Sequence, residues 1–178
     1  VDETLNLMQG VNYHHEFEVL PGVTASFYDA GHILGSAVTY MKIEDEGKTI
    51  ELGFSGDLGR PNMPILRDPA IIPDVDYFIC ESTYGGRFHE DFDMSEAKVV
   101  EVINRAIERK GKIIVPAFSL GRTQELVYLL HTIFEKGVVP LIPVYVDSPL
   151  SFNATAVFRR HTECYDLETS AHILRNED

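Results

Sequence analysis

The chain has 178 residues, of which 44% are hydrophobic, and its 28 acidic against 15 basic residues give a formal net charge of −13. This length and composition predict a globular protein with one good core or two small ones, and they exclude a disordered chain. No run approaches the roughly 18 apolar residues that a membrane span needs, and residues 1–4 lack the basic start of a signal peptide.

The first half of the chain is predicted to be mostly β-structure. A short helix is expected over residues 2–9, and strands over residues 17–20, 23–28, 37–43 and 49–54 form a β-meander with turns at Gly22 and Gly47. Residues 58–73 contain four prolines, which predict a loop along the edge of the domain. The apolar residues 77–80 then predict a short, fully buried strand that ends at Glu81.

Two of these strands end in small-residue turns, each of which leaves one side chain suited to bind a metal. Residues 29–37 read DAGHILGSA and carry His32, and residues 54–60 read FSGDLGR and carry Asp57. Imidazole and carboxylate groups are zinc ligands, and the neighbouring glycines allow sharp turns. The two turns therefore predict the rim of a metal site. Taken alone, His32 also fits a hydrogen-bonded structural histidine, and Asp57 a turn former.

From about residue 95 the pattern changes to alternating helices and strands. Helices are expected over residues 95–110 and 122–136, and buried strands of the parallel type over residues 112–116 and 143–146. This alternation of helices and strands predicts a Rossmann-like α/β arrangement with right-handed crossovers.

Each of these later strands leads into a further motif, PAFSLGRTQE at residues 116–125 and DSPL at residues 147–150. The motifs place Arg122 and Ser148 after strand ends, where open α/β sheets bind ligands. Contact with a phosphate is one interpretation of these two residues, and a plain cap on the following helix is the other.

In this order, the motifs resemble the metallo-β-lactamase superfamily, and specifically its β-CASP branch of nucleic-acid-cutting hydrolases. Residues 29–37 resemble the third metal motif and residues 54–60 the fourth, while ESTYG at residues 81–85 resembles the acidic motif that opens the β-CASP part. The resemblance implies an α/β fold of two parts. Residues 1–94 would be the C-terminal part of a metallo-β-lactamase αββα sandwich, and residues 95–178 the first part of a Rossmann-like β-CASP domain.

The resemblance also implies roles for individual residues. Two zinc ions are expected, with His32 on one of them and Asp57 bridging both as a catalytic residue. Glu81 would support catalysis by steering and polarising a histidine from a later motif, although a cap on the following turn is an alternative. The expected substrate contacts are His89, Arg122 and Ser148.

The motifs ESTYG and PAFSLGRTQE resemble those of RNA-cutting members of the branch more than those of DNA-repair members. The expected function is therefore a zinc-dependent ribonuclease acting on single-stranded RNA. A homodimer is possible within this resemblance. The two cysteines favour a reducing cytoplasm over a disulfide framework. The superfamily's His-x-His-x-Asp-His run and the later β-CASP histidine motifs have no counterpart in the sequence, so we expect an inactive fragment.

The net negative charge argues against RNA binding, because proteins normally contact phosphate groups through Lys and Arg side chains. Bound divalent cations would reverse the local field and weaken this objection. Two alternatives to the ribonuclease stay open. One is a non-catalytic RNA-binding or scaffold member of the family, and the other is a different hydrolase of the superfamily.

Overall fold

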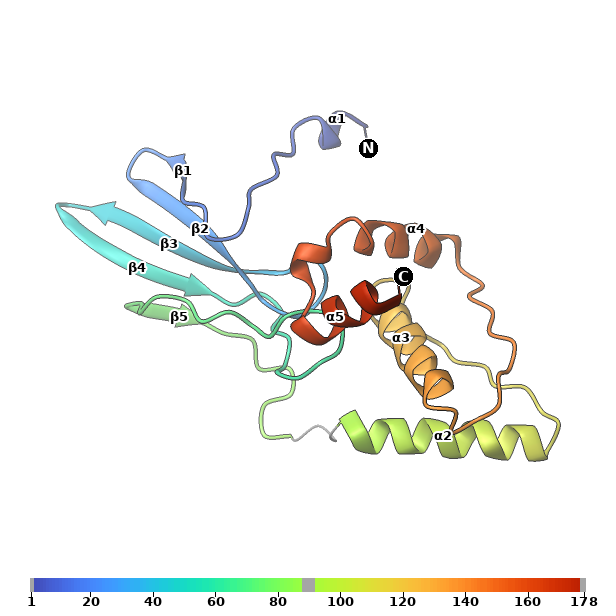
Figure 1. Cartoon of the computed structure of the whole chain (residues 1–178). Helices are drawn as coiled ribbons and strands as arrows, with labels where there is room; N and C mark the ends of the chain where they lie inside the picture. Colours follow the sequence, from blue (N-terminus) through green and yellow to red (C-terminus); the bar gives the residue numbers. More distant parts are fainter. Residues whose placement is uncertain (1, 88–91, 177–178) are drawn as a thin grey trace. The chain divides into compact units, whose positions relative to one another are not determined.

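The structure is a computed structural model that describes residues 2–87 and 92–176, and it divides into two compact units (Figure 1). Unit 1 comprises Val1–Pro61 and Asp68–Ser82, and unit 2 comprises Asn62–Arg67 and Thr83–Asp178. The division of the sequence into domains at residues 94 and 95 stays a prediction. The elements of unit 1 are α1 (Asp2–Leu5), β1 (Phe17–Leu20), β2 (Val23–Asp29), β3 (Ala37–Asp45), β4 (Lys48–Phe54) and β5 (Tyr77–Ile79).

Unit 1 is built on one five-stranded sheet in the order β1-β2-β3-β4-β5 (Figure 1). Strands β1 to β4 pair as successive antiparallel neighbours, and β5 joins β4 in parallel. The hairpin turns contain Gly22 and Gly47, with φ of 80° and 77°, a backbone region that glycine enters without steric cost. The predicted β-meander is therefore confirmed, whereas the expected helix over residues 2–9 is shorter.

Of the apolar residues 77–80, Tyr77–Ile79 form a strand, β5, but this strand is not buried. Tyr77, Phe78 and Ile79 are 64%, 48% and 55% exposed, and Cys80 is also exposed. The prediction of a fully buried strand was wrong. The strand lies at the edge of the sheet and pairs with β4 alone in the part of the chain that the structure describes, so its faces receive little cover.

Unit 2 is mainly helical. Its elements are α2 (Phe92–Glu108), α3 (Arg122–Glu135), α4 (Pro149–Phe158), the 3-10 helix η1 (Thr162–Cys164) and α5 (Leu167–Asn176). Ile103 of α2 packs with Leu129, Ile133 and Val139 in a small core. None of the described helices has the length and apolar character needed to cross a bilayer.

The two strands expected in this half are not formed. Residues 112–116 and 143–146 have no assigned strand, and Ile114 and Tyr145 are 90% and 86% exposed. An extended apolar segment becomes a buried strand only where a neighbour accepts its backbone hydrogen bonds. The described residues of unit 2 supply one isolated bridge, between Leu66 and Tyr165. The mixed α/β class itself is confirmed by the sheet of unit 1 and the helices of unit 2.

Candidate functional site

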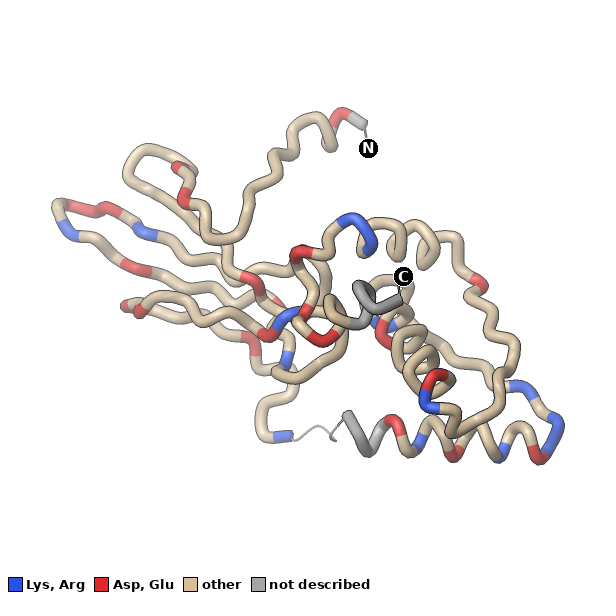
Figure 2. Tube along the Cα trace, viewed as in Figure 1, with Lys and Arg blue, Asp and Glu red and all other residues tan. Residues whose placement is uncertain are grey.

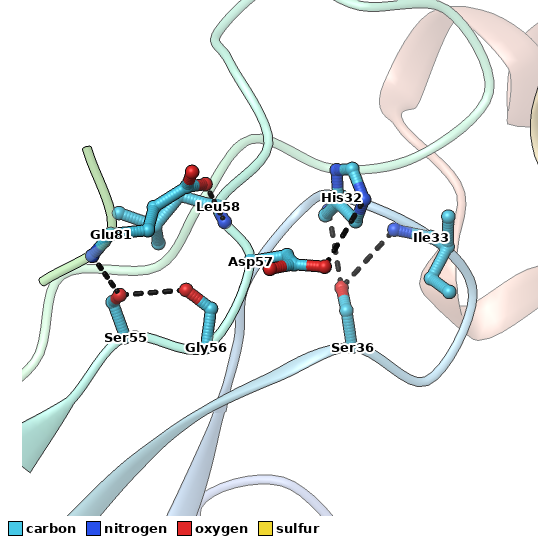
Figure 3. Close-up of polar contacts among 8 residues, drawn as sticks. All are labelled: His32, Ile33, Ser36, Ser55, Gly56, Asp57, Leu58 and Glu81. Carbon is cyan, nitrogen blue, oxygen red and sulfur yellow. Dashed lines mark hydrogen bonds and ion pairs between the residues drawn. The ribbon is translucent and has the colours of Figure 1, made fainter. Parts of the chain in front are cut away.

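The turn after β2 presents His32 (Figure 3). The backbone N–H of Gly31 donates to Oδ1 of Asp29 at 2.8 Å, and Gly31 adopts a φ of 61°. The hydroxyl oxygen of Ser36 accepts hydrogen bonds from the backbone N–H groups of His32 and Ile33, at 3.1 and 3.2 Å. The backbone of this turn is thus fixed by local hydrogen bonds, while the imidazole remains 43% exposed.

The turn after β4 presents Asp57, whose side chain is 79% exposed. Behind it, Ser55 is only 1% exposed, and its hydroxyl donates to the carbonyl oxygen of Gly56 at 2.7 Å. Glu81 follows β5 and bonds on both sides of Asp57. Its backbone N–H donates to Oγ of Ser55 at 3.0 Å, and its Oε1 accepts from the backbone N–H of Leu58 at 2.7 Å (Figure 3).

Gly59 joins the two turns directly. Its backbone N–H donates to the carbonyl oxygen of Ala30 at 2.8 Å. A Cβ atom at position 59 would lie 1.7 Å from the carbonyl oxygen of Gly31, so only glycine permits this approach of the two backbones. The contact sets the spacing of the two metal-binding candidates, and Nε2 of His32 lies 4.0 Å from Oδ2 of Asp57.

His32 and Asp57 fit a divalent metal in both donor chemistry and spacing. Two ligands of one tetrahedral zinc, each about 2.1 Å from the ion, are roughly 3.4 Å apart. A small rotation of these exposed side chains would shorten the distance between Nε2 of His32 and Oδ2 of Asp57 from 4.0 Å to this value. Among the side chains that the structure describes, no three from His, Cys, Asp or Glu gather as a metal-binding group. This part of the chain thus supplies two donors, and a four-ligand site needs others.

The contacts of Glu81 show how it can support the Asp57 turn. The sequence-based prediction gave it a histidine partner from a later motif, and the alternative was a cap on the turn that follows it. Its carboxylate accepts a hydrogen bond from the backbone of Leu58, 23 residues earlier in the chain, and the role beside a later histidine stays a prediction. Holding the Asp57 turn is a role that the sequence alone did not indicate.

Two of the predicted substrate contacts, Ser148 and Arg122, belong to unit 2. Ser148 caps α4 by accepting a 3.1 Å hydrogen bond from the backbone of that helix, and its hydroxyl lies 3.1 Å from that of Ser119. Arg122 begins α3 and forms a 2.8 Å ion pair with Glu125. The contact of Ser148 fits the capping interpretation, whereas the N-cap of α3 is Gly121 and has no side-chain capping hydrogen bond. Phosphate contact stays a prediction for both residues. His89 lies outside the described residues.

Sequence reasoning did not single out Ser36, Ser55 or Gly59 as part of the site. The available signal was their position in the motifs, since each lies within four residues of His32 or Asp57. Serine hydroxyls commonly bond to backbone groups in turns. Which backbone groups they meet depends on tertiary contacts between turns that are distant in sequence.

Charge is unevenly distributed along the chain (Figure 2). Acidic residues occupy the hairpin between β3 and β4, at residues 44–46. Basic residues gather at the end of α2 and just beyond it, where Arg105, Arg109 and Lys112 line a groove of about 320 Å³. The net charge of −13 therefore does not describe every surface of the protein.

Comparison with known proteins gives one family match and a set of relatives. Residues 123–178 match the Beta-Casp domain. Ribonuclease TTHA0252 of Thermus thermophilus is 31% identical over 178 residues, which are 100% of this chain and 40% of the relative. Transcription termination factor FttA of Methanosarcina mazei is 34% identical over 167 residues, which cover 92% of this chain and 26% of that protein.

A eukaryotic relative extends the comparison. Cleavage and polyadenylation specificity factor 73 of Drosophila melanogaster is 29% identical over 165 residues, 90% of this chain and 23% of that protein. The chain thus spans between 23% and 40% of the lengths of these three relatives.

Proposed function

Because this chain belongs to the β-CASP branch of the metallo-β-lactamase superfamily, we propose that the whole protein hydrolyses RNA phosphodiester bonds at a metal centre. The chain contributes His32 and Asp57 to that centre. One observation carries the proposal: two turns locked together by Gly59 bring Nε2 of His32 within 4.0 Å of Oδ2 of Asp57. One relative is named a ribonuclease and another a cleavage factor, which supports the choice of reaction.

Zinc is the proposed metal, with two ions in the complete centre, His32 on one and Asp57 on both. A metal held by His32 and Asp57 would supply Lewis-acid chemistry: it would polarise a phosphoryl oxygen and lower the pKa of a bound water. The residues of this chain provide fixed geometry. Glu81 and Gly59 hold the backbone around Asp57, so its carboxylate needs little reorganisation when the centre assembles.

Single-stranded RNA is the proposed substrate, with Arg122 and Ser148 as phosphate contacts and His89 as a further contact. The guanidinium of Arg122 is 65% exposed and lies at the start of α3, where backbone N–H groups favour an anion. We also propose that the protein forms a homodimer, which light scattering can measure. Its proposed location is the cytoplasm.

The direct test is Asp57→Ala in the whole protein, assayed on end-labelled single-stranded RNA. We expect cleavage to fall by more than about 100-fold, because loss of a metal ligand should exceed the 10- to 100-fold cost of losing an outer hydrogen-bond partner. Circular dichroism and thermal melting should remain close to the wild type, since the Asp57 side chain is 79% exposed.

Asp45→Ala provides the control, because Asp45 is an exposed acid at the β3–β4 hairpin of the same sheet. This variant should cleave RNA at the wild-type rate. Undiminished cleavage by Asp57→Ala would remove Asp57 from the metal centre. A wild-type protein that binds RNA but cleaves none, with or without added zinc, would favour the scaffold alternative.

A further inference from the structure

Ser55 is buried beside the candidate metal centre and has no ligating role of its own. We infer that Ser55 is a positioning residue for Asp57, because its hydroxyl connects the Asp57 turn to Glu81; the inference rests on the proposed metal centre. Through these contacts, the hydroxyl would determine the direction in which the Asp57 side chain points. Its loss would therefore alter metal binding without removing any ligand.

The hydroxyl of Ser55 both donates a hydrogen bond within the turn and accepts one from outside it. It donates to the carbonyl oxygen of Gly56 at 2.7 Å and accepts from the backbone N–H of Glu81 at 3.0 Å. The backbone N–H of Ser55 in turn donates to the carbonyl oxygen of Ile79, the last residue of β5, at 2.9 Å. Ser55 thus joins the end of β4 to the end of β5, where the motifs FSGDLGR (residues 54–60) and ESTYG (residues 81–85) begin.

Glu81 closes this arrangement on the other side of Asp57. Its Oε1 accepts a 2.7 Å hydrogen bond from the backbone N–H of Leu58. Ser55 and Leu58 flank Gly56 and Asp57, so one residue, Glu81, contacts both ends of the four-residue turn (Figure 3). The anchoring of Glu81 through Ser55 therefore determines where the carboxylate meets Leu58.

The Asp57 side chain itself has little else to orient it. In the described part of the chain its one polar contact is with His32 at 4.0 Å, and the side chain is 79% exposed. The position of its carboxylate consequently follows the backbone of the turn. Gly56, at a φ of 56°, offers no side chain that would stiffen this backbone. The hydrogen bonds through Ser55 and Glu81 must supply that stiffness.

Replacing Ser55 by alanine removes one oxygen atom and keeps Cβ, so the packing around this position is preserved. The N–H of Glu81 then loses its acceptor in a site that is 1% exposed at Ser55. We expect Glu81 to shift and its bond to Leu58 to weaken. The Asp57 turn would then sample more conformations, and the cost would appear as weaker metal binding.

The test uses Co²⁺ as a spectroscopic probe in the whole protein and compares Ser55→Ala with Ser26→Ala. Ser26 is a matched control, since it is a buried serine of β2 in the same sheet, 6% exposed, and away from both turns. Ser55→Ala should weaken Co²⁺ affinity by about 10- to 100-fold and change the visible absorption bands of the bound ion. Ser26→Ala should leave both unchanged.

Hydrogen exchange gives a readout that needs no metal. In Ser55→Ala, the peptide covering residues 54–60 should exchange faster than in the wild type, because the N–H of Leu58 is held less firmly. Ser26→Ala should not change exchange in that peptide. Melting temperatures of all three proteins show whether a difference reflects general loss of stability.

The outcomes separate the inference from the proposed function. Wild-type affinity and spectrum in Ser55→Ala would overturn the inference alone, and so would an equal loss of Co²⁺ affinity in Ser26→Ala. A wild-type protein that binds no Co²⁺, or binds it equally well after Asp57→Ala, would overturn the proposed centre and the inference with it.

Discussion

Gly59 allows the two turns to approach each other because it has no side chain. A Cβ atom at this position would meet the carbonyl oxygen of Gly31 at 1.7 Å and the backbone nitrogen of His32 at 2.8 Å. Both are backbone atoms, which cannot rotate away as the end of a flexible side chain could. Any larger residue must therefore separate the turn that carries Asp57 from the turn that carries His32.

Gly59→Ala is expected to lower both stability and metal affinity. Overpacking of this kind costs about 1–3 kcal/mol, and forced separation of the turns breaks the 2.8 Å hydrogen bond from Gly59 to Ala30. Urea unfolding measures the first effect and Co²⁺ titration the second. Gly10→Ala is the matched control, because a Cβ at Gly10 meets nothing within 4 Å and its unfolding free energy should change by less than about 1 kcal/mol. Equal stabilities of the two variants would contradict the proposed contact.

The residues that could be predicted from sequence are those whose environment is local. His32 and Asp57 each follow an apolar strand and lie next to a glycine, so their motifs predict exposed side chains at strand ends. The contact of Gly59 with Ala30 and the bond from Leu58 to Glu81 join segments 29 and 23 residues apart. Such contacts depend on how the strands pair, which no single motif specifies.

Secondary-structure elements also could be predicted from sequence where their contacts are local, and could not where their contacts are distant. The hairpins of β1 to β4 pair with their neighbours in sequence, so alternation and glycine turns were enough to predict them. Strand β5 and residues 112–116 and 143–146 were predicted to be buried from their apolar content. Burial needs cover from other elements, and the described residues do not provide it for Phe78, Ile114 or Tyr145.

Strands β3 and β4 are also joined by a side-chain hydrogen bond that responds to pH. Tyr40 of β3 is 5% exposed, and its hydroxyl donates to Oε1 of Glu51 on β4 at 2.7 Å. Burial, followed by this hydrogen bond to the carboxylate, raises the pKa of Tyr40 from its ordinary value of 10.0 to about 12. The folded protein therefore keeps the Tyr40 proton at a pH where the unfolded chain has lost it.

This shift predicts that the protein becomes less stable at alkaline pH. A raised pKa contributes stability that is complete below pH 10 and is lost as the pH rises towards 12. Urea unfolding at a series of pH values should show the decline, and Tyr40→Phe should make it shallower. Some decline should remain, because burial also raises the pKa of Tyr128 and Tyr165. An identical pH dependence in Tyr40→Phe would contradict the assignment.

At the scale of the whole molecule, the metal-binding donors are fewer than a complete site needs. The described residues bring together His32 and Asp57, and zinc sites in proteins use three or four protein ligands. The three relatives named above are longer than this chain, which spans between 23% and 40% of their lengths. The proposed activity therefore belongs to the whole protein rather than to these residues alone.

The 178-residue chain by itself should consequently hold zinc weakly and cleave no RNA. After dialysis against metal-free buffer, elemental analysis should find far less than one zinc per chain, because two exposed donors replace only part of the water bound to the ion. Asp57→Ala in the same chain should give the same low value. One or two tightly held ions would contradict this expectation. Candidates for the missing donors would then be the exposed His14 and His15, His89, or residues of a second copy, and His→Ala variants would identify which of them complete the site.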